Sequence, residues 1–283
     1  MKTLKRILRD RALLAGLMIV VLLVLAAAFA TQLATFPGAV ADVDPAHRLE
    51  PPGAIFLLGT DRMGADIYSR LLFGARLTIL IAVVATTVSV VIGVPIGLVA
   101  GFYRGWFSDL LMRVSDIFLA VPQIVLAIAI AQTLGPAIQN VILALSATYW
   151  PFWARLVYAE ARSVRNEVFI EAAIAMGASP LRVMLLHVLP SIASSLIIRT
   201  TVGMGGTILV AASLGFLGLG AQPPAPEWGR MVAESREFLP QAWWYATAPG
   251  LAILLVVMGF NLLGDGLRDA LDPKLRRGGW RDG

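Results

Sequence analysis

The chain has 283 residues, of which 58% are hydrophobic and only 14% charged, and its mean hydropathy is +0.78. A soluble domain of this length exposes far more charge, so the composition indicates a polytopic membrane protein. The net charge of +5 and the pI near 10 do not require a nucleic-acid partner, because basic residues in such a chain orient its helices and contact anionic lipid. The sequence contains no cysteine, which excludes disulfides and cysteine metal ligands.

Charge-free intervals locate the membrane spans, each of which needs about 20 apolar residues. The third interval is too long for one helix, and Gly135-Pro136 divides it. The fourth and fifth intervals form one span around Arg199. We therefore predict an all-α fold with about six transmembrane helices and both termini on the same side. The intervals are 12–41, 77–103, 117–154, 183–198, 200–226 and 238–264.

The placement of basic residues predicts the orientation. Sixteen of the 23 Lys and Arg residues fall on one side of the membrane and six on the other, with Arg199 inside a span. The positive-inside rule then places both termini and the loop Glu171–Pro190 in the cytoplasm. The two groups are residues 2–11, 104–113, 155–182 and 268–281 inside, and 48–76 and 230–236 outside.

The N-terminus imitates a secretory signal, since basic residues and an apolar run precede small residues at 26–30. The run is long for a signal peptide, so we predict an uncleaved first helix. The first outside segment, 31–76, begins as an irregular loop and continues with Asp66 as a helix cap. That helix is either a separate helix on the membrane surface or an N-terminal extension of the second span.

A second outside segment begins after Leu214. It contains three prolines that predict extended chain, and then a helical stretch, Met231–Phe238. Aromatic residues at the start of the last span are typical of a belt at the membrane interface. They are Trp243, Trp244 and Tyr245.

Within the spans, two glycine-rich segments and one arginine stand out. Gly93–Gly97 and Gly203–Gly206 favour close helix packing over contact with a substrate. Arg199 follows Pro190 by nine residues, about 13 Å along a helix. Its guanidinium either snorkels to the cytoplasm or faces the interior of the bundle, where it would be a candidate for a substrate pathway.

The loop Glu171–Pro190 has the pattern of two short capped helices that meet at a corner. Gly177 predicts a left-handed stop, and Ser179 predicts a cap with Pro180 in the first turn. Pro190 is expected to end the second helix. A shaped protrusion of this kind between spans suggests a part that another protein grips.

Motifs for catalysis are missing. No P-loop is present, because the three lysines, Lys2, Lys5 and Lys274, do not follow glycine-rich turns. His47 and His187 fall on opposite sides of the membrane and form no joint metal site. Ser179 lacks a recognisable base and orienting acid, so helix capping explains it better than nucleophilic catalysis. We therefore expect no enzyme and no cofactor bound by this chain.

The positions of the ionisable residues disfavour two other classes of membrane protein. An intramembrane hydrolase would need paired acids within spans, whereas Asp116 and Asp265 lie at helix ends that water can reach. A secondary carrier usually places ionisable groups near the middle of the membrane, where this chain offers only Arg199. The energy for transport is therefore expected to come from outside the chain.

Several segments together resemble a known family. Glu171-Ala172-Ala173, Gly177 and Leu189-Pro190 are similar to the EAA loop of type I ABC-transporter permeases of bacterial importers. Three more segments resemble the DppC/OppC-type permeases of the dipeptide, oligopeptide and nickel importer family, and the resemblance extends from Leu58 to Pro273. These segments are LGTDRMGADIYSRLLFGAR, SLGFLGLGAQPPAPEWGRM and FNLLGDGLRDALDP.

The resemblance implies a type I permease fold in the bacterial cytoplasmic membrane. A homologous second permease would complete the translocation path, two cytoplasmic ATPase subunits would bind ATP and grip the EAA loops, and an extracytoplasmic solute-binding protein would deliver cargo. The cargo would be di- or oligopeptides, with nickel chelates, glutathione or sugars as alternatives. The implied divisions are 1–75, a first helix with an outside segment; 76–265, a core with five helices and a coupling loop at about 160–190; and 266–283, a cytoplasmic tail.

Residue roles also follow from the resemblance. Glu171, Ala172, Ala173 and Gly177 would form the coupling helix that sits in a groove of the ATPase. The turn back to the membrane would be shaped by Ser179, Pro180, Leu189 and Pro190. Two positions depart from the family pattern: His187 stands where the general EAA pattern has isoleucine, and Arg199 stands where an uncharged residue is expected.

Overall fold

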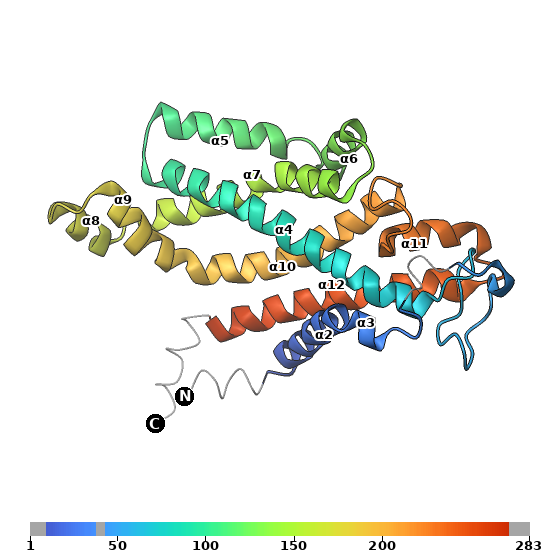
Figure 1. Cartoon of the computed structure of the whole chain (residues 1–283). Coiled ribbons are helices and arrows are strands. Elements are labelled where there is room, and N and C mark those ends of the chain that lie inside the picture. Colours follow the sequence, from blue (N-terminus) through green and yellow to red (C-terminus); the bar gives the residue numbers. More distant parts are fainter. Residues whose placement is uncertain (1–9, 38–42, 272–283) are drawn as a thin grey trace, which may run out of the picture.

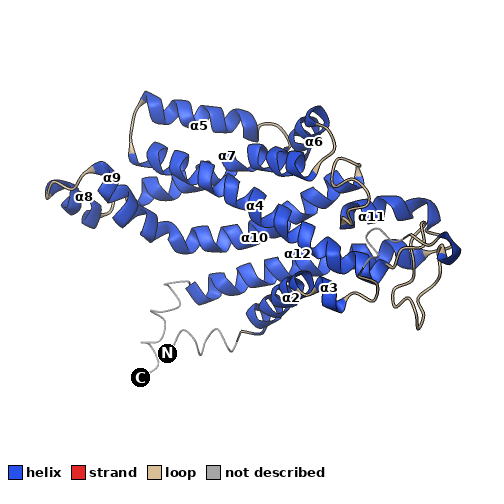
Figure 2. Cartoon of the chain, viewed as in Figure 1, coloured by secondary structure: helices blue, strands red, loops and turns tan. Residues whose placement is uncertain are grey.

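The computed structural model describes residues 10–37 and 43–271. Within them the chain is helical, with no strand beyond one isolated bridge between Thr60 and Asp66 (Figure 2). Four helices are long and apolar enough to cross a membrane. They are α2 (Arg11–Ala28), α4 (Ile67–Phe102), the continuous helix Pro180–Phe216 that contains α10 (Leu189–Phe216), and α12 (Trp243–Leu271).

Two further parts complete the bundle. The pair α5 (Trp106–Leu119) and α6 (Gln123–Leu134) is bent by 83° and would give a fifth span if it crosses as one unit. Helix α7 (Ile138–Val164) has 27 residues, about 40 Å, and is long enough to span a membrane. It is less apolar than the four spans because it carries Arg155, Glu160 and Arg162. The described residues thus hold four or five spans by length and composition, against the predicted number of about six.

The third predicted span is broken twice. The break at Gly135-Pro136 is confirmed, since α6 ends at Leu134 and Gly135 has a φ of 87°. A second break, between Leu119 and Gln123, was not predicted. Pro122 accounts for it, because proline has no N–H for the helix and restricts the residue before it.

Helix α4 begins earlier than the charge-free interval. Asp66 caps it by accepting a hydrogen bond from the Ser69 N–H at 2.9 Å, and the helix then runs for 36 residues. The extension of the second span is therefore the correct alternative, and a separate surface helix is not formed. Pro95 lies inside α4 without ending it.

Close packing of α4 against α7 forms the centre of the bundle (Figure 1). A Cβ added at Gly93 would lie 2.5 Å from the Trp150 carbonyl oxygen, and one at Gly97 would lie 2.3 Å from the Ala154 carbonyl oxygen. The two backbones approach this closely because glycine has no side chain at these positions. The packing interpretation of Gly93–Gly97 is confirmed.

The first and last spans lie side by side. A Cβ at Gly266, near the end of α12, would come 2.4 Å from Cβ of Leu13, near the start of α2. These two helix ends and the loop that follows α7 lie toward the same end of the molecule (Figure 1). The terminal residues themselves lie outside the described ranges, so the prediction that both termini share the cytoplasmic side stays a prediction.

The other end of the molecule is a cap built from the outside segments. It contains α3 (Ala30–Leu33), η1 (Pro45–His47), α11 (Trp228–Ser235) and η3 (Arg236–Phe238). Arg70 on α4 pairs with buried Asp61 and lies 3.9 Å from Glu234 of α11. These ion pairs connect the cap to the bundle.

Two residues of the predicted interface belt belong to this cap instead. Tyr245 is fully buried and donates to Glu234 at 3.1 Å, and Trp244 donates to the Thr60 carbonyl at 3.4 Å. Only Trp243 is exposed, at 61%. The belt prediction was wrong for Trp244 and Tyr245, because the outside segments fold back over the start of α12.

Candidate functional site: the loop after α7 and the seam between α7 and α10

The loop between α7 and α10 carries α8 (Val168–Ala175) and α9 (Pro180–Val183), and it protrudes from one end of the molecule (Figure 1). Gly177 has a φ of 85°, in the left-handed region that favours glycine. Its N–H bonds the Ile174 carbonyl at 2.9 Å, and the Ala178 N–H bonds the Ala173 carbonyl at 3.1 Å. These bonds close the end of α8 as the sequence predicted.

The second helix of the loop begins as predicted. Ser179 caps α9 by accepting a hydrogen bond from the Arg182 N–H at 3.4 Å, and Pro180 occupies the first turn. A proline is tolerated there because that N–H has no partner within the helix.

Pro190 does not end this helix, which corrects the prediction. The chain is one helix from Pro180 to Phe216, 37 residues long, with a π-helical segment at Met184–Val188. The Leu189 N–H bonds the carbonyl of Met184, five residues back, directly before Pro190. Wider π turns change the hydrogen-bond register and accommodate the missing N–H of proline. Leu189 and Pro190 therefore lie within a helix and form no turn.

A small core fastens the loop to the bundle. Ile170 and Ala173 of α8 pack with Val183 and Met184 and with buried side chains of α4 and α7. The helix Pro180–Phe216 then continues from this core through the membrane region. Packed side chains therefore join the loop to the bundle.

The outer surface of the same loop is apolar and exposed. Val168 is 79% exposed, Met176 83% and Leu181 62%. Glu171, in the first turn of α8, and Ala172 are exposed on the same protrusion, whereas Ala173 faces the core. The structure thus brings the predicted coupling residues Glu171, Ala172, Gly177, Ser179 and Pro180 together on one surface. Exposed apolar side chains at a tip with one acidic group are typical of a docking surface.

Arg199 lies on α10 away from this loop, and its side chain is exposed. Across the seam with α7, Ser195 donates a hydrogen bond to Glu160. Gly203 lies over the ring of Trp153, with 3.2 Å between an added Cβ and the ring. Sequence reasoning missed Glu160, because its partner on α10 is 35 positions away in the chain.

Glu227, before α11, is a second residue that sequence reasoning missed. It is only 4% exposed and accepts a hydrogen bond from the Ala221 N–H at 2.8 Å. A Cβ at Gly215 or Gly220 would lie 1.8 or 2.0 Å from its carboxylate oxygens, so the two glycines leave the space that it fills. Burial raises the pKa of Glu227 to about 7, although the Ala221 hydrogen bond and the charge of Arg230 lower it.

A pH dependence follows from Glu227. Its pKa is about 7 in the fold against an ordinary 4.5, so the folded state binds more protons between these values. The stability that protonated Glu227 contributes is therefore present below about pH 4.5 and is lost as the pH rises through about 7, a change of roughly 3 kcal/mol. The thermal midpoint of the purified protein should fall by a few degrees from pH 5 to pH 8.

Glu227→Gln keeps the shape of the side chain and its hydrogen-bond acceptor but removes the charge. The thermal midpoint of this variant should therefore vary much less with pH than that of the unchanged protein. Equal slopes of midpoint against pH in the two proteins would contradict this role of Glu227. Differential scanning fluorimetry in one detergent across this pH range measures both.

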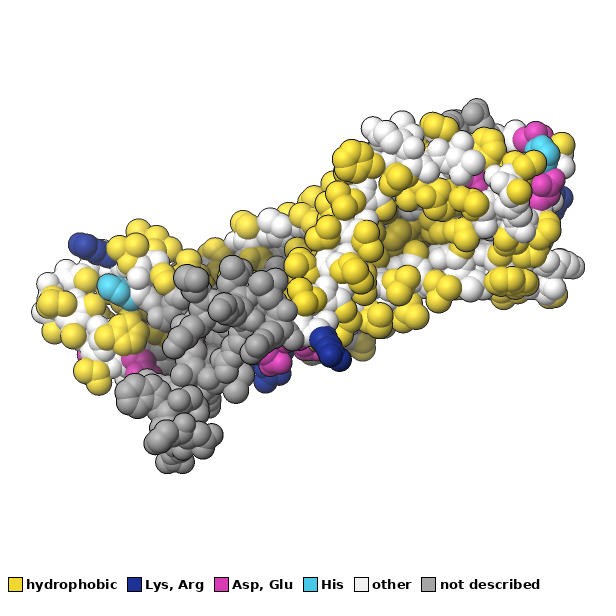
Figure 3. All heavy atoms as spheres, turned by 90° about the horizontal axis from the view of Figure 1, so that it is seen from below, with side chains coloured by type: hydrophobic (Ala, Val, Ile, Leu, Met, Phe, Trp, Pro, Cys, Tyr) yellow, Lys and Arg dark blue, Asp and Glu magenta, His cyan; other side chains and the backbone are white. Residues whose placement is uncertain are grey.

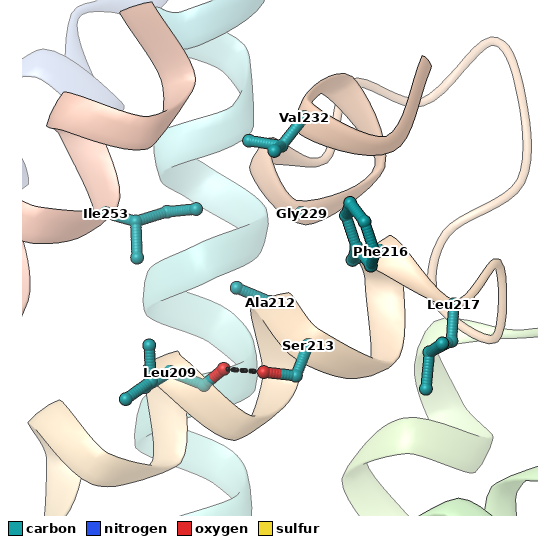
Figure 4. A pocket seen from close by; sticks show the side chains of 8 residues that line it. All are labelled: Leu209, Ala212, Ser213, Phe216, Leu217, Gly229, Val232 and Ile253. Atoms are coloured by element: carbon teal, nitrogen blue, oxygen red, sulfur yellow. Dashed lines mark hydrogen bonds between the residues drawn. The ribbon is translucent and has the colours of Figure 1, made fainter. Parts of the chain in front are cut away.

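An apolar groove of about 330 Å³ lies between α10, α11 and α12 (Figure 4). Ser213 is the one side chain with a hydroxyl in its lining, and this hydroxyl is bonded to the Leu209 carbonyl at 2.8 Å. The groove therefore offers no polar side-chain group that would orient a charged ligand. It is lined by Leu209, Ala212, Ser213, Phe216, Leu217, Gly229, Val232 and Ile253.

Metal-binding groups do not gather in the part of the chain that the structure describes, where no three of His, Cys, Asp and Glu could share an ion. His47 pairs with Glu50 at 2.7 Å in the cap, where hydrogen bonding to Glu50 raises its pKa. His187 lies in the π-helical segment next to the loop, at the other end. In the face that Figure 3 shows, hydrophobic side chains cover much of the bundle, and acidic side chains and a histidine gather at one extremity.

Comparison with known proteins defines the class. Residues 93–277 match the family described as binding-protein-dependent transport system inner membrane component, and residues 2–52 match the N-terminal transmembrane domain of oligopeptide transport permease C. The chain belongs to this family of transport permeases of the bacterial inner membrane. The type I ABC permease predicted from the EAA loop is confirmed.

Particular relatives extend over nearly the whole chain. The dipeptide transport system permease protein DppC of Alkalihalophilus pseudofirmus is 43% identical over 96% of this chain and 89% of its own length. The glutathione transport system permease protein GsiD of Escherichia coli O157:H7 is also 43% identical, with the same coverage. An inward-facing structure of the MetNI methionine ABC transporter shares the fold, with a TM-score of 0.60, 23% identity and coverage of 71% of this chain and 96% of that one.

Proposed function

We propose that this chain forms half of the translocation path of an ATP-driven importer of di- or oligopeptides. The observation that carries the coupling part is the loop after α7, with exposed Val168, Met176 and Leu181 outside and a core beneath that joins it to α4, α7 and α10. A partner that moves this loop moves the bundle. Relatives named as dipeptide permeases support the cargo.

The proposed partners are the subunits that the family resemblance implies. Two ATPase subunits bind and hydrolyse ATP and contact the loop through its exposed residues Glu171, Ala172, Gly177, Ser179 and Pro180, whereas Ala173 packs in the core beneath. A second, homologous permease completes the path, and an extracytoplasmic solute-binding protein docks on the cap at the opposite end. This chain itself catalyses no reaction and holds no cofactor.

Reconstitution tests this proposal. The four kinds of subunit together in proteoliposomes should take up a labelled dipeptide when ATP is supplied on the ATPase side, and omission of this chain should abolish uptake. The chain alone should not transport when a proton or sodium gradient is applied. Gradient-driven uptake by the chain alone would show a secondary carrier and overturn the proposal.

Glutathione is a second cargo, favoured by relatives named as glutathione permeases at the same 43% identity. A competition experiment in the same proteoliposomes distinguishes dipeptide from glutathione as the cargo. Unlabelled dipeptide should reduce uptake of the labelled dipeptide more strongly than equimolar glutathione does. The reverse order would reassign the cargo and leave the ATP-driven importer intact.

A further inference from the structure

Arg199 lies near the middle of the 37-residue helix Pro180–Phe216, and its side chain is exposed. It takes part in none of the ion pairs formed among residues 10–37 and 43–271. A guanidinium that faces hydrocarbon is costly, so Arg199 should face water or polar groups in the assembled transporter. Its place on the helix therefore marks a surface that lipid does not cover.

Glu160 supplies the opposite charge on the same seam. Ser195, one helical turn before Arg199, donates its hydroxyl to Oε1 of Glu160. Oε2 of Glu160 is buried and has no hydrogen-bond partner among the described residues. A buried carboxylate oxygen without a partner calls for a donor that residues 10–37 and 43–271 do not supply.

Two glycines follow Arg199 on the same face of α10, one and about two turns further on. One turn after Arg199, Gly203 leaves the ring of Trp153 only 3.2 Å from the position of an added Cβ. Gly206, further along, has no atom within 4 Å of that position. The Trp153 Nε1–H is buried and, like Glu160 Oε2, has no hydrogen-bond partner in the described chain. An aromatic wall with a spare donor and an open position thus follow Arg199 along the same face of α10.

We propose that Arg199 and Glu160 bind the two charged ends of a zwitterionic cargo molecule of dipeptide size. The guanidinium takes the carboxylate through paired hydrogen bonds, and the half-buried carboxylate of Glu160 takes the ammonium group. Ser195, the partner of Glu160, and Arg199 are separated by about 6 Å of helix rise, and an extended dipeptide spans about 7 Å. This assignment rests on the proposed function and names the cargo-binding residues within it.

The test uses the whole transporter in proteoliposomes, with the unchanged chain and with Arg199→Gln and Glu160→Gln. The probes are labelled alanyl-alanine, its C-terminal amide and its N-acetyl derivative, each at a concentration that saturates the binding protein. Arg199→Gln should lower uptake of alanyl-alanine and of the N-acetyl form about tenfold, and that of the amide less than about twofold. Glu160→Gln should lower uptake of alanyl-alanine and of the amide by a similar factor and spare the N-acetyl form.

Arg113→Gln is the matched control, because Arg113 is an exposed arginine on α5 that forms no ion pair with the described residues. It should leave all three uptake rates unchanged. Arg199→Lys should retain more alanyl-alanine uptake than Arg199→Gln does.

If each variant loses uptake of all three probes equally, Arg199 and Glu160 have only a structural role and the proposal is overturned. Unchanged uptake rates in both variants would also overturn it. Restoration of alanyl-alanine uptake by Glu160→Arg combined with Arg199→Glu would show that the two residues pair with each other instead. If the unchanged transporter takes up none of the three probes when ATP is supplied, the proposal of a peptide cargo is overturned, and this site with it.

Discussion

Glu171→Lys is expected to lower dipeptide uptake about tenfold while the protein still inserts in the membrane. Glu171 is exposed in the first turn of α8, on the surface that we assign to the ATPase. Lysine there opposes the helix dipole and reverses a charge at the interface, which weakens docking. The amount of ATPase that copurifies with the affinity-tagged permease and the uptake rate should fall together.

Asp109→Lys is the matched control for this prediction. Asp109 is an exposed acid in the first turn of α5, outside the coupling loop, so the same charge reversal should leave ATPase copurification unchanged. Normal uptake with a normal amount of bound ATPase in Glu171→Lys would refute the contact. Glu171→Gln should give an intermediate loss, because it removes the charge without reversing it.

Gly97→Val is expected to have the largest effect on folding. The first side-chain atom would lie 2.3 Å from the Ala154 carbonyl oxygen and 2.8 Å from Cβ of Val157, both on α7. The helices must separate to accept it, and overpacking of this kind costs about 3 kcal/mol. The yield of monodisperse protein in size-exclusion chromatography and its thermal midpoint should both fall sharply.

Gly250→Val is the control, since Gly250 lies in α12 with nothing within 4 Å of an added Cβ. It brings the same change of residue and of helix propensity without the steric clash. A thermal midpoint for Gly97→Val equal to that of Gly250→Val would show that α4 and α7 do not need the close approach.

Two predicted features of the coupling loop are confirmed, and both depend on local interactions. The positive φ of Gly177 and the cap by Ser179 depend on a few neighbouring residues, and both are present. The prediction that a helix ends at Pro190 is wrong, because the π-helical segment before it accommodates the missing N–H. Proline chemistry alone cannot show whether the surrounding packing keeps the helix intact.

Two residues, one between α7 and α10 and one in the cap, show more clearly what cannot be predicted from the sequence. Arg199 stands out in the sequence as a charge within a span, but only the packing of α7 against α10 brings Glu160 to Ser195, one turn before Arg199. Glu227 likewise becomes a buried acid only because Gly215 and Gly220 fold around it. Neither pairing has a periodic signal, since each joins residues on separate elements.

The sequence by itself determined the membrane class, the helical fold and the punctuation of the coupling loop, because hydropathy, caps and glycine conformations act over a few residues. Its motifs also carried the resemblance that family membership confirmed. Only the tertiary structure decided that α4 extends to Asp66, that one helix passes through Pro190, and that Glu160 adjoins the turn before Arg199. These features depend on long-range packing, in which contacts between distant residues outweigh the preferences of each segment.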